Sequence, residues 1–317
     1  MEIVVPMDAF TANTKKPLTI AGIIVLAIFA TFPLFLGQYW LHTAIVGLFY
    51  VMMASSWNLL AGFTGQVSFA HAAFAGVGAY TSGILAAKAG LPPLVGLPIG
   101  IAVAAVLGLA LGSLCIRMGG IYLSLTTLGF SEILRIIVTN EYEITRGTMG
   151  LKVPPLFGDY SKTVSFYVLL VGAVLVLLLI RRILNSDLGT SFRAVQNDET
   201  AAASLGIPVV RVRILAFAIA GAMAGFAGSL YGHYLMLITP HILSLDLMFL
   251  VLAMTVIGGM GTFIGPVVGA LFLETLSEYI RVYGEYHILI FGLVALAAAR
   301  FAPQGMVGLW RRFRGSV

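Results

Sequence analysis

Long apolar segments separated by short polar ones run through almost the whole chain. A transmembrane helix needs about 20 apolar residues, and this pattern predicts an all-α membrane protein, a polytopic helical bundle of about ten transmembrane segments. The third and eighth segments contain several glycines, so we expect one or both to be broken or re-entrant. The segments lie at 18–36, 41–61, 71–87, 93–116, 120–139, 164–184, 213–236, 247–261, 264–283 and 286–302.

An even number of crossings places both ends of the chain on one side of the membrane. With both ends inside, twelve of the 18 Lys and Arg residues fall on the cytosolic side, as the positive-inside rule requires. We therefore expect a cytoplasmic tail at 1–17, a transmembrane domain at 18–302 and a cytoplasmic tail at 303–317. The polar loop at 184–213 then lies in the cytosol, and the loop at 140–163 lies on the outer side.

The composition agrees with a membrane protein and excludes other classes. Hydrophobic residues make up 60% of the chain and charged residues only 10%, whereas about 25% of residues are charged in soluble domains. The single cysteine, Cys115, excludes an intramolecular disulfide. The net charge of +5 does not indicate nucleic-acid binding, because the basic residues flank apolar segments instead of clustering on a polar domain. The expected surroundings are a lipid bilayer.

The loop at 184–213 is a polar island in an otherwise apolar sequence. We predict one short helix over 190–205, which Asn185 or Asp187 can cap at its start. Gly206 can end this helix in the left-handed conformation, and Pro208 prevents its continuation. A compact helix lined with Arg and carboxylate side chains would offer a docking surface to a cytosolic protein. An ordinary solvated loop is the alternative.

The outer loop at 140–163 contains glycines and prolines that should break any regular element, among them Gly147, Gly150, Pro154 and Pro155. The stretch from Arg146 onward would then project outward. A substrate-delivery protein could dock there, and a plain connecting loop is an equally good interpretation.

The stretch 58–80 combines glycines with polar side chains at membrane depth, where a transport route is expected. Backbone that leaves helical geometry there must be buried in protein or line a wet cavity. The candidate pathway side chains are Thr64, Gln66, Ser68 and His71. His71 could act as a proton relay or substrate contact, or it could be hydrogen-bonded packing within the bundle.

The stretch 119–135 carries a second set of polar candidates. Tyr122 and Thr126 share one helical face, and together with Ser124 they could line a pore or form interhelical hydrogen bonds. Glu132 and Arg135 can pair at i,i+3, and we expect this pair to be structural. A glycine cluster at 258–269 cannot form a continuous helix, and Gly258 and Gly261 join the candidate pathway residues.

No catalytic constellation is recognisable in the sequence. The Gly-x4-Gly-Lys-Ser/Thr phosphate loop is absent, so the chain cannot bind and hydrolyse ATP by that means. No His-Glu-x2-His motif or cysteine pair suggests a metal site. The prediction is a protein without enzymatic activity, metal or cofactor of its own.

Several segments together resemble the permease subunits of branched-chain amino acid importers, and they cover most of the chain. The extra N-terminal span makes the chain similar to the larger of the two permeases of such systems, the LivM type. The segments that carry the resemblance are Gly62 to His71, Gly76 to Tyr80, Gly119 to Leu128, Arg193 to Glu199, Gly258 to Thr262 with Gly265-Pro266, and Pro303 to Leu309.

The resemblance implies an ATP-binding-cassette importer in the bacterial cytoplasmic (inner) membrane. Its other parts would be a second homologous permease, two ATPase subunits that bind ATP and Mg²⁺, and a periplasmic binding protein. Such permeases carry a cytoplasmic Glu-Ala-Ala, three residues, then Gly; this chain departs from it, since Glu199 stands one position early. The implied residues of ATPase coupling are Arg193, Asp198, Glu199, Thr200, Ala201, Ala202 and Gly206.

The expected function is transfer of branched-chain or other hydrophobic amino acids across the membrane. Two alternatives remain open from the sequence. A related permease could carry urea or short amides, and an ion- or proton-coupled secondary transporter would work without ATPases, with Glu132, Arg135 and His71 as coupling residues. A membrane enzyme is disfavoured by the missing cluster of nucleophile, metal ligands or paired carboxylates.

Overall fold

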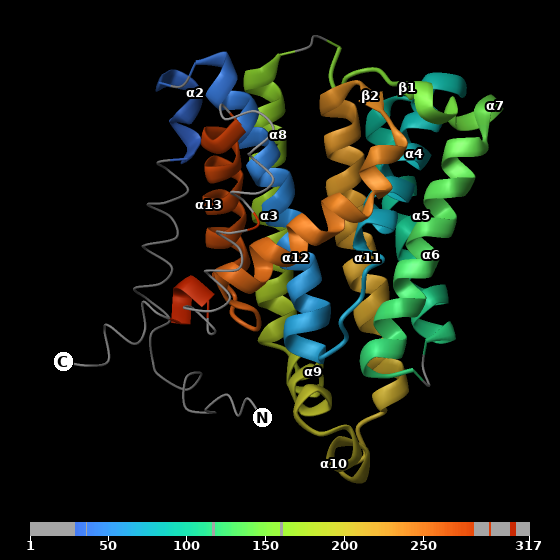
Figure 1. Cartoon of the computed structure of the whole chain (residues 1–317), viewed down its shortest axis with the longest axis vertical. Helices are drawn as coiled ribbons and strands as arrows, with labels where there is room; N and C mark the ends of the chain where they lie inside the picture. Colours follow the sequence, from blue (N-terminus) through green and yellow to red (C-terminus); the bar gives the residue numbers. More distant parts are fainter. Residues whose placement is uncertain are drawn as a thin grey trace.

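The computed structural model describes residues 29–35, 37–115, 118–158, 161–281, 292 and 305–308, and the described chain is almost entirely helical (Figure 1). The tail predicted at 1–17 and most of the first and tenth segments lie outside these ranges, and the tail predicted at 303–317 is described only at 305–308. The elements before the polar loop at 184–213 are α2 (Phe32–Phe35), α3 (Gln38–Thr64), α4 (His71–Lys88), α5 (Pro93–Leu114), α6 (Gly120–Asn140), α7 (Tyr142–Thr145), η2 (Gly147–Met149), β1 (Leu151–Lys152) and α8 (Lys162–Leu184).

The second half of the chain contributes two short polar helices, one long central helix and a broken pair. Among the residues that the structure describes, five helices are long and apolar enough to cross a membrane, namely α3, α5, α6, α8 and α11, and α12 is a shorter apolar helix. The elements of this half are α9 (Asp187–Asn197), α10 (Glu199–Ser204), α11 (Val209–Leu235), β2 (Leu237–Ile238), η3 (Pro240–Leu243), α12 (Leu245–Gly259) and α13 (Gly265–Ile280).

The long helices stand side by side, with α9 and α10 at one end and β1, β2 and α7 at the other (Figure 1). Helix α11 packs against α3, α4 and α5. Its glycines permit backbone contact: a Cβ on Gly228 would lie 2.0 Å from the Ala75 carbonyl oxygen, and one on Gly225 would lie 2.3 Å from the Ala104 Cβ. Helices in lipid gain no hydrophobic burial by associating, so they associate through the close packing that small residues allow.

The third predicted segment (71–87) is not broken, because it forms the continuous helix α4. Gly76 and Gly78 lie inside this helix. A break comes earlier in the chain: Gly65 ends α3 in the left-handed conformation with φ of 71°. Residues 65–70 are non-helical and run back from the lower end of α3 toward the middle of the molecule, where α4 begins (Figure 1). We call residues 65–70 the re-entrant segment.

The eighth predicted segment (247–261) is helical up to Gly259, where α12 ends. The short η3 precedes α12, and the Ser244 hydroxyl between them accepts a hydrogen bond of 3.3 Å from the Leu247 N–H, capping α12. At the end of α12, Gly259 and Gly261 have positive φ values of 126° and 75°. They form the turn at 260–264 that reverses the chain into α13. The prediction that the glycine cluster cannot be a continuous helix is confirmed.

The outer loop differs from the irregular projection that we expected, because part of it is ordered by pairing. Strand β1 pairs with β2 in an antiparallel ladder that aligns Leu151 with Ile238. The Leu151 and Val153 side chains are buried beneath the loop, and Arg146 takes a left-handed φ of 65° between α7 and η2. The pairing with β2 and the burial of Leu151 and Val153 therefore order this part of the loop.

Candidate functional site

The polar loop at 184–213 folds into two helices, so our prediction of one helix over 190–205 is wrong. Helix α9 begins at Asp187 after Ser186 and ends at Asn197, and α10 runs from Glu199 to Ser204. Asp198 between them is extended, and its carboxylate accepts hydrogen bonds from the N–H groups of Thr200 (2.8 Å) and Ala201 (2.9 Å). An Asp at this position caps a new helix instead of continuing the old one.

The second helix forms an exposed tip at the lower end of the molecule (Figure 1). The Glu199 carboxylate forms an ion pair of 2.6 Å with Arg213, which ties α10 to α11. Ala202 is buried against the body of the protein, whereas Leu205 is 81% exposed. Gly206 follows in the left-handed conformation, as predicted, with φ of 82°. The tip therefore presents small side chains and one apolar side chain at the surface.

Helix α9 packs on the lower end of α8. A Cβ on Gly189 would lie 2.5 Å from the Ile183 carbonyl oxygen, so only a residue without a side chain allows this approach. Arg193 donates a hydrogen bond of 2.9 Å from Nη2 to the Leu184 carbonyl oxygen. Its guanidinium thus braces α9 against α8.

A direct contact joins α9 to helix α3 of the bundle. The Gln196 side-chain Nε2 donates a hydrogen bond of 2.7 Å to the carbonyl oxygen of Gly62 in the last turn of α3. A Cβ on Gly65 would lie 3.6 Å from Gln196 Cγ, so the end of α3 rests on α9. Sequence reasoning placed Gln196 in a family-like segment but gave it no role. No sequence signal identified Gly62 as its partner.

The same end of α3 holds the turn between α12 and α13. Asn58 Oδ1 accepts a hydrogen bond of 2.8 Å from the Gly261 N–H, and Asn58 Nδ2 donates one of 2.9 Å to the Thr262 carbonyl oxygen. A Cβ on Gly62 would lie 2.7 Å from the Gly261 nitrogen. Gln196, Gly62, Asn58 and Gly261 therefore form a continuous contact, which we call the coupling contact, from the helix pair α9–α10 to the turn between α12 and α13.

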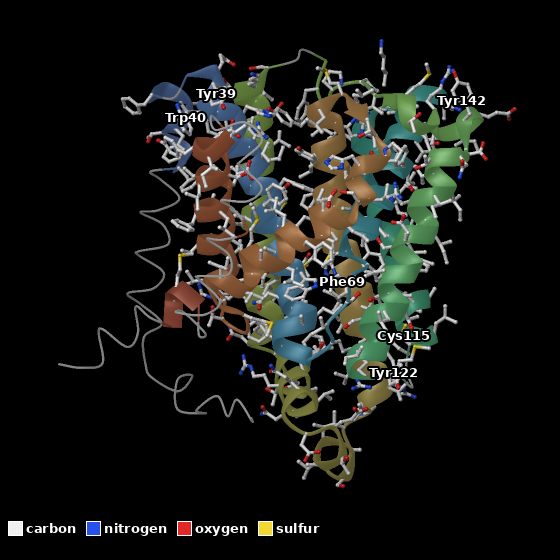
Figure 2. All side chains as sticks on the ribbon, viewed as in Figure 1. Tyr39, Trp40, Phe69, Cys115, Tyr122 and Tyr142 are labelled. Carbon is white, nitrogen blue, oxygen red and sulfur yellow. The ribbon has the colours of Figure 1, made fainter. Side chains whose placement is uncertain are left out.

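The re-entrant segment is held by side chains from α3 and α6. Ser124 donates a hydrogen bond of 2.9 Å to the Val67 carbonyl oxygen, and the Thr127 hydroxyl accepts one of 2.9 Å from the Phe69 N–H. The Trp57 indole N–H donates to the Ser68 carbonyl oxygen at 2.7 Å. Phe69 lies about halfway between the two ends of the molecule (Figure 2). Non-helical backbone at this depth requires such internal partners. Sequence analysis identified Ser124 but missed Thr127 and Trp57.

The predicted pathway residues on this segment are buried. Gln66 donates a hydrogen bond of 3.0 Å to the Thr64 hydroxyl, and the Ser68 hydroxyl accepts one of 3.2 Å from the Ala70 N–H. His71 is fully buried at the first residue of α4, and its ring contacts Phe74 edge-on. The Ser56 backbone interacts with the imidazole, but neither ring nitrogen forms a hydrogen bond of normal geometry.

The remaining predicted pathway residues lie apart from this cluster. Tyr122 is 76% exposed near the lower end of α6 (Figure 2), and Thr126 Oγ1 donates to the Met118 sulfur at 3.2 Å. Gly258 serves the close contact of α12 with α13, since a Cβ there would lie 2.0 Å from the Gly265 carbonyl oxygen. Only Gly261, through Asn58, joins the coupling contact. No group of three or more His, Cys, Asp or Glu residues that could hold a metal occurs among the described residues.

Comparison with known proteins gives this geometry its context. Residues 39–299 match the family model described as the permease component of branched-chain amino acid transport systems. The permease protein LivM of the high-affinity branched-chain amino acid transport system of Escherichia coli K12 is 30% identical over 95% of this chain and 77% of its own length.

More distant relatives match over less of the chain. A probable LivM from Methanocaldococcus jannaschii is 27% identical over 68% of this chain and 70% of its own length. The permease protein LivH of the high-affinity branched-chain amino acid transport system of E. coli K12 is 26% identical over 83% of this chain and 92% of its own length. No solved structure matches the chain.

Proposed function

The chain belongs to the family of permease components of branched-chain amino acid transport systems, and we propose that it forms one half of the substrate pathway of an ATP-binding-cassette importer and couples that pathway to ATPase subunits. The relatives are named for branched-chain amino acid transport, and the proposed substrates of this chain are branched-chain and other hydrophobic amino acids. The likeness to both LivM and LivH supports a second, homologous permease as its partner.

The observation that carries the coupling role is the hydrogen bond between Gln196 and Gly62. Helices α9 and α10 project from the bundle with an exposed apolar Leu205 and small residues around it, which suits insertion into a cleft of a cytosolic ATPase. When two ATPases close on ATP, they would displace this pair of helices. The displacement would reach the end of α3 through Gln196, and the turn at 260–264 through Asn58.

The proposed topology has ten crossings, with both termini in the cytosol of a bacterium and the chain in its inner membrane. Six crossings correspond to α3, α5, α6, α8, α11 and α13, and two discontinuous ones to the re-entrant segment with α4 and to η3 with α12. The first and tenth crossings are those predicted at 18–36 and 286–302 from the sequence. In this orientation the end with α9 and α10 faces the cytosol.

A reconstituted complex tests this function. The chain would be purified in mild detergent with its companion subunits, inserted into liposomes that contain ATP, and supplied outside with the binding protein and labelled leucine. We expect a second permease and two ATPases in the purified complex, and leucine uptake that stops without ATP. Uptake by the chain alone, driven by an ion gradient, would contradict the importer and favour a secondary transporter.

A further inference from the structure

A polar cavity opens on the outer half of the molecule, away from the coupling contact and the re-entrant segment. It has a volume of about 530 Å³ and lies between α6, η2, η3 and the first turn of α12. This volume is within the usual range of small-molecule sites, about 300–1,000 Å³. The residues of its lining that matter here are Glu132, Arg135, Thr148, Pro240, Leu245 and Asp246.

The charged groups that line this cavity differ in how they are paired. Arg135 pairs with Glu132 one turn away, and its Nε donates hydrogen bonds of 2.9 and 3.1 Å to the two carboxylate oxygens. Nη2 of Arg135 also bonds Glu132. Its other terminal nitrogen, Nη1, has no hydrogen-bond partner among the residues that the structure describes. One face of the guanidinium fork therefore remains available to a further acceptor.

Asp246 supplies the complementary charge from the opposite wall. It is the second residue of α12, it is exposed to the cavity, and it interacts electrostatically with Arg135 across the opening. Within the described chain its carboxylate takes part in no ion pair. The cavity thus offers one cationic donor and one unpaired carboxylate on facing elements, with the apolar Pro240 and Leu245 beside them.

We propose that this cavity receives the zwitterionic head of the transported amino acid on the outer side of the membrane. The substrate carboxylate would bind Nη1 of Arg135, because a guanidinium fork matches carboxylate geometry. The ammonium group would bind Asp246, and an apolar substrate side chain would lie against Pro240 and Leu245. This inference rests on the proposed function, and it adds a binding site for the substrates named there: urea and short amides carry neither charge and cannot use this pair.

The place of the cavity fits a site of first contact. Thr148 of η2 lines it, so it lies directly below the outer loop, where a binding protein would release its substrate. Asp246 also links it to the moving parts, because α12 leads from this residue to Gly259 and into the turn at 260–264 that Asn58 holds. Closing the substrate between Arg135 and Asp246 would bring α6 and α12 together.

The test uses the reconstituted complex with its binding protein, ATP inside the liposomes and labelled leucine outside. Asp246→Asn should lower uptake by about tenfold or more, because an interaction with a charged group is lost. Asp246→Glu should retain most of the uptake. Arg135→Gln should also lower it, and Glu143→Gln, an exposed carboxylate of the same outer surface that does not line the cavity, should leave it unchanged.

ATP hydrolysis stimulated by the loaded binding protein separates substrate binding from docking. It should stay at the wild-type rate, at the wild-type concentration of binding protein, in Asp246→Asn. Wild-type uptake in Asp246→Asn, an equal loss in Glu143→Gln, or a higher binding-protein requirement would each overturn the zwitterion site while leaving the importer intact. Failure of the wild-type complex to take up leucine with ATP would instead remove the proposed function, and this inference with it.

Discussion

The side-chain amide of Gln196, on the polar helix α9, donates a hydrogen bond of 2.7 Å to the backbone carbonyl of Gly62 in α3. Residues 134 positions apart in the chain thereby join the surface that would meet an ATPase to the helix that leads into the re-entrant segment. The bond is short and its acceptor is backbone, so a displacement of α9 acts on the frame of α3 and not on a flexible side chain.

Gly62 should tolerate no side chain. A Cβ at this position would lie 2.2 Å from Asn58 Oδ1 and 2.7 Å from the Gly261 nitrogen, so Gly62→Ala would push Asn58 away from the turn that it holds. Overpacking of this kind costs about 1–3 kcal/mol, and we expect a lower thermal midpoint and reduced uptake. Gly129→Ala is the matched control, because nothing lies within 4 Å of a Cβ there. Equal behaviour of the two variants would contradict the close contact.

The cap at Asp198 should set the stability of α10. Asp198→Ala removes the acceptor for the Thr200 and Ala201 N–H groups, a loss worth about 0.5–2 kcal/mol. Hydrogen exchange at these amides should accelerate by the corresponding factor, while the membrane helices stay unchanged. Asp198→Asn keeps a capping oxygen and should show nearly wild-type protection. Unchanged exchange in Asp198→Ala would mean that packing alone orders this helix.

Gly206 should be required for its backbone conformation and not for lack of space. Its φ is 82°, and a Cβ there would meet nothing within 4 Å. A left-handed residue with a side chain costs about 1–2 kcal/mol, more for the branched Val than for Asn. Gly206→Val should therefore insert into the membrane and yet hydrolyse ATP with less uptake, whereas Gly206→Asn should remain active. Normal coupling in Gly206→Val would show that the chain can leave α10 in another way.

His71 should be dispensable for folding. Its ring is fully buried without a hydrogen bond of normal geometry, and an unpaired buried polar group costs about 1–3 kcal/mol. His71→Leu should keep or raise the thermal midpoint of the purified complex and retain at least part of the uptake. If the midpoint holds but uptake is abolished, the imidazole contacts the substrate or carries a proton. A clear fall in the midpoint would show that the ring has a partner.

The sequence predicted the helical membrane fold, the left-handed Gly206 and the discontinuous glycine cluster, because each rests on local chemistry. The length of an apolar segment indicates whether it can cross a membrane, and a glycine just after a helix indicates where the helix ends. The sequence did not reveal that the loop at 184–213 divides into two helices at Asp198. An Asp side chain can lie on a continuous helix or cap a new one, and the direction of the following backbone decides between the two. We expected Gly76 and Gly78 to interrupt a helix, but both lie inside α4 and allow close contact with neighbouring elements. A single sequence does not show such contacts.

The candidate site was predicted only in part for the same reason. Ser68, Gln66 and Ser124 were identified as polar groups at membrane depth, and the structure brings them to the re-entrant segment. Their partners Trp57 and Thr127 were not identified, since a hydrogen bond between distant helices depends on how the helices cross. Gln196 lies within a segment that carries the resemblance to the family. Its role depends on the hydrogen bond to Gly62, which the sequence does not show.

The number of leucine molecules taken up per ATP hydrolysed by Gln196→Leu tests the coupling most directly. Leu has a similar size but cannot donate to the Gly62 carbonyl, and Asn197→Leu, exposed on the same helix, is the control. We expect Gln196→Leu to assemble and to hydrolyse ATP, with uptake per ATP reduced about tenfold, as loss of about 1.4 kcal/mol of coupling would give. A wild-type ratio in Gln196→Leu would contradict transmission through this contact.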